Sequence, residues 1–198
     1  MGGQAGPPQY YQVLLKVAVD NGINLEAILG AREMLTDAPE AGKFIWRASS
    51  TWKNGTHCYS KCEKFNAFGE DHPHRQEYGV DMDHPELFAS EDNGATPIEL
   101  VMLGLAGCLT AGVASVATMR DIQLRSVTAT IEADMDLLGV MGVDPDVRNG
   151  FSGVRVTFNI DADASPDDIA AIVAQSQKRS AVYDIMVNPT NVVVEVNK

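Results

Sequence analysis

The sequence is poor in cysteine and in positive charge. Only three cysteines occur among the 198 residues, Cys58, Cys62 and Cys108, and this small, odd number does not suit a secreted scaffold held by disulfides. Lysine and arginine number 15 against 27 aspartates and glutamates, a net charge of −12, which disfavours binding to nucleic acid or to anionic membranes. We therefore expect a cytoplasmic protein with no nucleic acid or membrane partner.

Several common functional motifs are also missing. The sequence contains no glycine-rich phosphate loop, no dinucleotide-binding fingerprint, no G-x-S-x-G elbow and no H-E-x-x-H motif. Its first residues, MGGQAGPPQYY, have neither the basic region nor the apolar core of a signal peptide. These absences argue against ATP, NAD or serine hydrolase chemistry and against export, and we expect no cofactor.

Residues 100–119, LVMLGLAGCLTAGVASVATM, carry no charge at all. A run of about 20 apolar residues can cross a bilayer, but this one is diluted by small and hydroxyl residues and has no flanking cluster of lysine or arginine. A helix without a polar stripe has no side that is suited to contact with solvent. We therefore predict a core helix over Pro97–Arg120 that is buried on every side.

Hydrophobic periodicity over the rest of the chain predicts an α+β fold. Residues 1–42 are expected to form a helical extension that precedes a domain over residues 43–198. Expected helices are Tyr10–Asp20, Leu25–Leu35 and a helix from Pro166, capped by Ser165, to about Arg179. Expected strands are Phe44–Ser50, Thr56–Phe65, Glu77–Asp81, two alternating segments near residues 127–135 and 154–160, and Val192–Val196.

Cys108 lies within the uncharged run, on a stripe of small residues that includes Gly104 and Gly112. By spacing alone it is one more small residue that lets another backbone approach. Its place in the middle of a helix also denies it the N-terminal dipole that lowers a thiol pKa. A reactive Cys108 would need a cation or hydrogen-bond donors from elsewhere in the fold.

Glu99 fits a capping box, in which Thr96 and Glu99 satisfy each other's backbone amides. It precedes Cys108 by nine residues, roughly 13–14 Å along a helix axis. If Glu99 serves a thiol site, an intermediary or a partner subunit is needed.

Cysteine and histidine gather a second time, in His57, Cys58, Cys62, His72 and His74. These residue types bind zinc and other soft metals. Along a regular strand, however, Cys58 and Cys62 would lie about 13 Å apart, too far to share a metal or form a disulfide. Only a bulge or turn could bring them together, so a metal site remains an alternative.

Three motifs resemble the OsmC/Ohr family: Asp83-His84-Pro85, residues 91–100 (EDNGATPIEL) and residues 105–110 (LAGCLT). The likeness extends from about Phe44 to the C-terminus. It implies an OsmC-like fold, an intertwined homodimer of α+β subunits with a buried central helix packed on antiparallel sheets. Such a partner would supply the cover that an uncharged helix needs.

The resemblance also implies an activity. Well-known family members are thiol peroxidases that reduce organic hydroperoxides, and their cysteine passes through a sulfenic acid and a disulfide before an external thiol reduces it. Carried over to this sequence, Cys108 would be the peroxidatic residue and Glu99 a further catalytic residue. A role in the oxidative-stress response would follow.

The sequence departs from the family pattern at the second cysteine, whose place within residues 176–186 is taken by Ala181. An exogenous thiol, or Cys58 or Cys62 from a neighbouring strand, would then have to resolve an oxidised Cys108. The glutamate of the hydroperoxide branch directly follows the helix-start proline, where this chain has Ile98. That branch also uses an arginine of the first hairpin, where this chain offers Lys53 or Arg47. Two other functions stay open: a non-catalytic dimer that binds a small apolar ligand, and a metal-binding protein.

Overall fold

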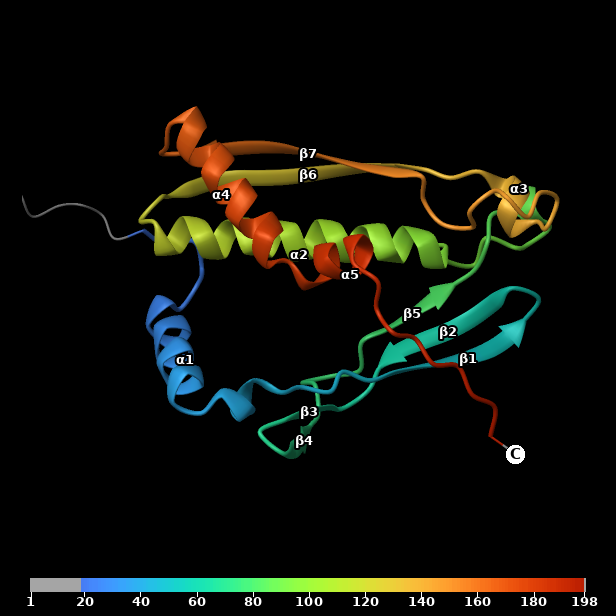
Figure 1. The fold of residues 1–198 in the computed structure, drawn as a ribbon, viewed down its shortest axis with the longest axis horizontal. Coiled ribbons are helices and arrows are strands. Elements are labelled where there is room, and N and C mark those ends of the chain that lie inside the picture. Colours follow the sequence, from blue (N-terminus) through green and yellow to red (C-terminus); the bar gives the residue numbers. More distant parts are fainter. Residues whose placement is uncertain (1–18, 198) are drawn as a thin grey trace, which may run out of the picture.

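The computed structural model describes residues 19–197. Its centre is the long helix α2 (Pro97–Met119), flanked by the antiparallel ribbon of β6 (Leu124–Asp134) and β7 (Gly153–Ala162). Helices α4 (Pro166–Arg179) and α5 (Ala181–Val187) pack on another side of α2. Figure 1 shows the ribbon and the two helices arranged around α2.

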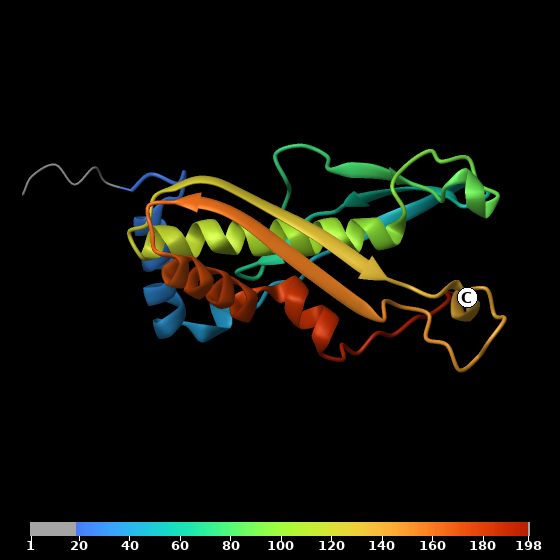
Figure 2. The ribbon, with the colours of Figure 1, turned by 90° about the horizontal axis from the view of Figure 1, so that it is seen from above.

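The chain before α2 forms separate small elements. Strands β1 (Ala48–Asn54), β2 (His57–Cys62) and β5 (Gly79–Met82) make an antiparallel sheet in the order β1-β2-β5, and β3 (Phe65–Ala67) pairs with β4 (Glu70–His72). In Figures 1 and 2 this region extends away from the β6–β7 ribbon. The remaining elements are helix α1 (Leu25–Asp37), the 3-10 turns η2 (Pro39–Gly42) and η3 (Glu86–Phe88), and the short helix α3 (Leu137–Val140).

The core lies between α2, α4 and the β6–β7 ribbon. Val113 and Ala117 of α2 and Ile172 of α4 are completely buried. Ser176 donates a hydrogen bond of 2.7 Å to the carbonyl oxygen of Leu109, and a Cβ atom at Gly112 would overlap its hydroxyl. A glycine at 112 therefore sets how closely α2 and α4 approach.

The alternation predicted for β6 and β7 is confirmed. Val127, Ala129 and Ile131 are half-buried toward α2 while their neighbours Thr128 and Thr130 face solvent. Arg125 and Arg155 form ion pairs with aspartates on the outer face. Such exposed pairs add little stability, so the ribbon is held mainly by its apolar face.

Asn21 connects the start of the described chain to the end of α2. Its side-chain amide donates to Thr118 Oγ1 (3.1 Å) and to the Ile122 carbonyl oxygen (3.0 Å), and its Oδ1 accepts from the backbone N–H of Leu124 at 2.9 Å. α1 itself has no buried residue.

Predicted and observed elements differ at several places. The helix expected over Tyr10–Asp20 lies almost entirely outside the described residues. The strand expected over Phe44–Ser50 is wrong in its bounds, because β1 runs on to Asn54 and the turn falls at Gly55 and Thr56. The single strand expected over Thr56–Phe65 is two strands, β2 and β3, in different sheets.

The strand expected at Val192–Val196 is wrong for the single chain. Residues 191–197 have no regular secondary structure, and Val194 and Val196 are each 88% exposed. A segment rich in β-branched residues becomes a strand only when another strand supplies hydrogen-bond partners for its backbone. In this chain the segment pairs with no other strand among the described residues.

Candidate active site around Cys108

Cys108 lies in the middle of α2, half-buried, and its sulfur meets the start of α5. The buried hydroxyl of Ser180 is 3.1 Å from Cys108 Sγ and donates to it. Ser180 is the N-cap of α5, and its Oγ also accepts the backbone N–H of Tyr183. This second bond fixes the hydroxyl beside the sulfur.

Opposing influences act on the pKa of Cys108. Partial burial raises this pKa, but the Ser180 hydroxyl and the backbone N–H groups of Val182 and Ala181 lower it, and together they prevail. The net pKa lies below the ordinary value of a cysteine thiol. Tertiary structure thus brings the donors that the position of Cys108 within its own helix could not.

Two cavities with mostly apolar lining residues lie next to the turn of α2 that carries Cys108, although Cys108 itself lines neither of them. One of about 480 Å³ is lined by Val101 and Leu105 of α2 and by Tyr183 of α5, and Arg148 is its one charged lining residue. The other, of about 290 Å³, also touches Tyr183 and includes Leu109. An organic molecule could therefore lie beside this turn of α2.

Glu99 does not reach Cys108 within one chain. The capping box is present as predicted: the Glu99 carboxylate accepts from the Thr96 amide (2.8 Å) and hydroxyl (2.7 Å), and Thr96 Oγ1 accepts from the Glu99 amide. Hydrogen bonds from Thr96 lower the pKa of Glu99. Nine residues are two and a half turns of an α-helix, so Glu99 and Cys108 lie on opposite faces of α2.

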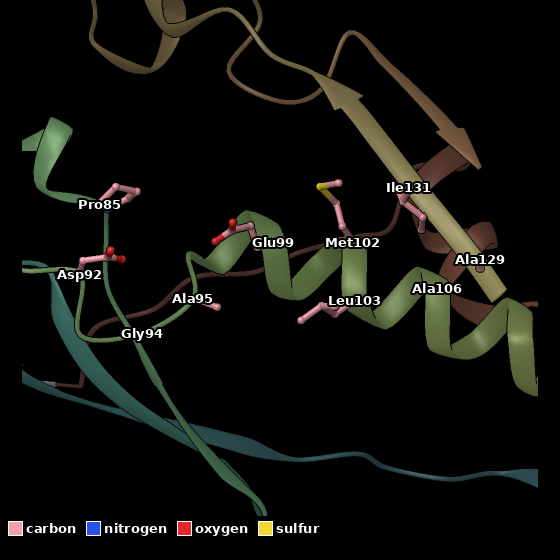
Figure 3. A pocket seen from close by; sticks show the side chains of 10 residues that line it. All are labelled: Pro85, Asp92, Gly94, Ala95, Glu99, Met102, Leu103, Ala106, Ala129 and Ile131. Atoms are coloured by element: carbon pink, nitrogen blue, oxygen red, sulfur yellow. The ribbon is translucent and has the colours of Figure 1, made fainter. Parts of the chain in front are cut away.

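Glu99 instead lines a groove of about 610 Å³ beside the N-terminal half of α2. In Figure 3, Met102 points from α2 toward Ile131 of β6, and Pro85 and Asp92 come from the loop that precedes the helix. That loop is organised by Asp83, which accepts hydrogen bonds from Thr56, from Asn93 and from the amide of His84. The hydrogen bond from Thr56 does most to hold the pKa of Asp83 far below its usual range.

Cys58 and Cys62 are not brought to Cys108. Both lie on β2 in the three-stranded sheet, whereas α2 packs mainly on β6, α4 and α5. The two candidate cations are engaged elsewhere: Arg47 forms an ion pair with Asp71 (3.0 Å), and Lys53 lies over the ring of Tyr59.

The histidines and cysteines of the proposed metal cluster are also dispersed. His57 forms a 2.8 Å pair with Asp81, His72 stacks on Phe65, and the ring of His74 lies tilted against Phe65. Across residues 19–197, no three His, Cys, Asp or Glu side chains are grouped as metal ligands.

Ser180 is the site residue that sequence reasoning missed. The predicted end of α4 at about Arg179 is confirmed, but a second helix that begins at Ala181 with Ser180 as its N-cap was not predicted. A signal was present, because Lys178 and Arg179 suit the last turn of a helix and a serine after them suits a new N-cap.

The sequence matches the family model of OsmC-like proteins over residues 90–195. The chain belongs to the OsmC-like family. The matched segment includes α2 with Cys108 and α5 with Ser180, and the α+β architecture agrees with the OsmC-like fold. No curated protein matches the sequence.

Solved structures with this fold share little sequence with the OsmC-like chain. An OsmC-like protein of Mycoplasma pneumoniae is 13% identical, with a TM-score of 0.54 over 71% of this chain and 86% of that one. An organic hydroperoxide resistance protein OsmC of Legionella pneumophila is 18% identical, with a TM-score of 0.52 over 72% and 88%. An OsmC-like protein of unknown function from Vibrio cholerae is 10% identical, with a TM-score of 0.51 over 70% and 91%. At these identities the likeness concerns the fold alone.

Within the described part of the chain, α2 is the one helix whose length and composition would allow it to cross a membrane. Here it forms the core of an OsmC-like domain, with Leu105, Leu109 and Val113 buried. The prediction that this helix is buried on every side is wrong for the single chain, because Val101 is 46% exposed and Leu103 is 62% exposed.

Proposed function

We propose that this OsmC-like protein is a thiol-dependent peroxidase that reduces organic hydroperoxides through Cys108, as part of an oxidative-stress response. The observation that carries the proposal is the Ser180 hydroxyl 3.1 Å from the Cys108 sulfur. A donor in that position stabilises the thiolate, which is the form that attacks the O–O bond. The name of the Legionella relative, an organic hydroperoxide resistance protein, supports the same reaction class.

The apolar cavities beside this turn of α2 favour an organic substrate over hydrogen peroxide. Val154 and Val156 of β7 and Tyr183 of α5 belong to both cavities. Burial of apolar groups contributes roughly 25 cal/mol per Å², and hydrogen peroxide has no such groups to bury. We therefore propose that an alkyl or aryl hydroperoxide is reduced faster than hydrogen peroxide.

A homodimer is the second part of the proposal. The single chain leaves large apolar side chains open to solvent, with Val101 of α2 46% exposed and Val194 near the C-terminus 88% exposed. Leu103 and Gly104 on α2 are uncovered, and a Cβ at Gly104 would meet nothing within 4 Å. A second copy packed on this face would cover the apolar surface and could bring its own Glu99 toward Cys108.

The remaining assignments follow from this function. We propose residues 43–198 as the OsmC-like domain and residues 1–42 as an extension, since α1 has no buried residue. Three free thiols suit a reducing cytoplasm. Because no other thiol approaches Cys108 within the described chain, an external thiol is the proposed reductant, with the partner's Cys58 or Cys62 as the alternative.

The test measures consumption of cumene hydroperoxide and of hydrogen peroxide by the full chain, with dithiothreitol as reductant. We expect faster turnover of the organic substrate and complete loss in Cys108→Ser. Ser176→Ala is the matched control, because Ser176 bonds to α2 at Leu109 without touching the sulfur. Equal rates for wild type and Cys108→Ser, or no sulfenic acid trapped at Cys108, would refute the proposal.

The second part is tested by sedimentation of wild type and of Leu103→Glu. We expect wild type to sediment as a dimer and the charged variant to dissociate. A monomeric wild type would refute it.

A non-catalytic role has one observation in its favour. A mostly apolar cavity of about 470 Å³ lies near the N-terminus of α2, lined by Phe88, Ile98, Met135, Leu137 and Met141 among others. It does not include Cys108. An apolar molecule that remains bound after purification and survives in Cys108→Ser would support a binding function at this second place.

A further inference from the structure

The cavity of about 470 Å³ at the N-terminal end of α2 is not lined by Cys108, and the proposed peroxidase reaction makes no use of it. Its walls come from three parts of the chain: the loop around η3, the first turn of α2, and the segment that connects β6 to β7 through α3. Small-molecule sites have volumes of this order and are formed where several elements meet. The cavity is therefore a candidate binding site in its own right.

Most side chains that line this cavity are apolar. Met135 and Met141 contribute flexible, polarizable thioethers, which adapt to the shape of a ligand. Phe88 contributes an aromatic ring, which meets the ring of His84 edge-on with 6.3 Å between the ring centroids. These walls favour a ligand with an apolar body.

Glu99 is the one carboxylate among the described residues that line the cavity. Its Oε2 accepts hydrogen bonds from the Thr96 amide (2.8 Å) and hydroxyl (2.7 Å), whereas its Oε1 has no hydrogen-bond partner within residues 19–197. The bonds from Thr96 lower the pKa of Glu99, which keeps the carboxylate ionised at neutral pH. Figure 3 shows this side chain pointing from α2 toward the loop that carries Pro85, another residue of the cavity wall. Its second oxygen is available to a ligand.

The chain around the cavity is strongly acidic. Residues 83–99 contain five aspartates and glutamates and no lysine or arginine, and residues 135–149 contain three aspartates and one arginine. That arginine, Arg148, lines the cavity of about 480 Å³ between α2 and α5 instead. The N-terminal end of α2 opposes the acidic field with only about half a positive charge. Because charge of one sign around a site attracts the opposite charge, a cation is favoured here and a carboxylate is repelled.

We propose that this cavity binds a small hydrophobic amine, with its apolar body between Phe88 and Met135 and its ammonium group on Glu99 Oε1. An ammonium group supplies the hydrogen-bond donors that this oxygen lacks, and an aromatic ring in the wall also attracts a cation. The inference goes beyond the peroxidase function and does not depend on it. A simple organic hydroperoxide carries no charge, so the ligand of this cavity differs from the proposed substrate.

Three probes with the same body test the preference for a cation: phenylpropylamine, phenylpropanol and phenylpropanoate, which are cationic, neutral and anionic at neutral pH. Each is titrated into the full chain while the methionine methyl resonances are followed by NMR. We expect the amine to bind about two- to fivefold more tightly than the alcohol, the effect of one exposed ion pair, and the carboxylate to bind most weakly.

The same titration locates the site. The methyl signals of Met135 and Met141, assigned through Met135→Leu and Met141→Leu, should shift with the amine. The signal of Met102, assigned through Met102→Leu, should not, because Met102 lines the neighbouring groove. Shifts confined to Met102 would overturn the proposal.

Glu99→Gln tests the anchor, because glutamine retains the capping box and removes the charge. The amine should then bind no more tightly than the alcohol. Asp92→Asn is the matched control: Asp92 lies in the same acidic loop, lines the groove rather than the cavity, and has φ 55°, which asparagine tolerates. This variant should keep most of the preference for the amine. An equal loss in both variants would overturn Glu99 as the anchor.

The remaining outcomes are equally decisive. Equal affinity for the three probes, tighter binding of the carboxylate, or no binding at millimolar concentration would overturn the proposal. If Glu99→Gln does not fold, salt replaces it: the advantage of the amine over the alcohol should shrink as ionic strength rises, and an advantage that salt leaves unchanged would overturn the ion pair. Cys108→Ser should bind the amine as wild type does, so a failed peroxidase assay and a failed amine titration refute different proposals.

Discussion

The regions on either side of Thr96 differ in how they are stabilised. From α2 onward, the helix, the ribbon and α4 enclose a common core, and Val113, Ala117 and Ile172 are fully buried. Before α2, every residue of β1 is exposed, and Ala67 is the one buried hydrophobic residue among those described. The region from α2 onward is stabilised by its own hydrophobic core, whereas the sheets before α2 enclose no core of their own. Cys108, which we propose as the catalytic thiol, lies in the region that has its own core.

The strongest test of this contrast is truncation of a side chain in the core. Ile172→Ala should lower the free energy of unfolding by about 2–5 kcal/mol, because the site is fully enclosed. Val80→Ala on β5, where the side chain is 39% exposed, should change it by less than about 1 kcal/mol. Urea denaturation measures both. If Val80→Ala lowers the free energy of unfolding as much as Ile172→Ala does, the two regions do not differ in the way described. If the loss at Val80 grows with protein concentration, a second copy of the chain covers the sheet.

Two glycines of α2 with different surroundings give the next largest effect. Gly112→Ala forces a methyl group against Ser176 and should cost about 1–3 kcal/mol. Gly104→Ala meets nothing within 4 Å, so in the single chain it should stabilise the helix by up to about 1 kcal/mol. If denaturation shows a loss at Gly104 too, a neighbouring subunit must approach that face.

The boundary between the regions is fixed by the cap of α2. Thr96→Ala removes the hydroxyl that accepts the Glu99 amide and donates to its carboxylate, and it should cost about 1 kcal/mol. Thr96→Ser retains the hydroxyl and should cost less. Thermal unfolding followed by circular dichroism measures the difference, and equal effects of the two changes would show that the cap does not stabilise this helix.

The last expected effect is on reactivity, and it arises at Ser180. Its hydrogen bond favours the Cys108 thiolate, so Ser180→Ala should raise the thiol pKa and move the midpoint of the alkylation rate to higher pH. At neutral pH less thiolate would remain and alkylation would slow. Cys58→Ser should leave the Cys108 midpoint in place. A shift in that variant instead would mean that the first region reaches the sulfur after all.

Sequence patterns predicted best where a segment carries its own signals. α2 and α4 begin at the predicted prolines, since Thr96 and Ser165 mark their caps and apolar residues follow at helical spacing. β1 and the C-terminal segment were mispredicted because pairing, rather than composition, decides where a strand lies. For the candidate site, Cys108 and the cap at Glu99 could be read from motifs. Ser180 could not be linked to Cys108, because 72 residues separate them and only tertiary packing joins them.

Asn21 has a consequence for the order in which the protein forms. Its side chain is satisfied by Thr118, Ile122 and Leu124, about a hundred positions further along the chain. Contacts between such distant residues carry a large loop-closure entropy and form late in folding. During synthesis Thr118, Ile122 and Leu124 emerge long after Asn21. These hydrogen bonds can therefore form only after α2 has left the ribosome. In refolding, the contact of Asn21 closes a loop of about a hundred residues, so a probe placed beside Asn21 should report a slow phase.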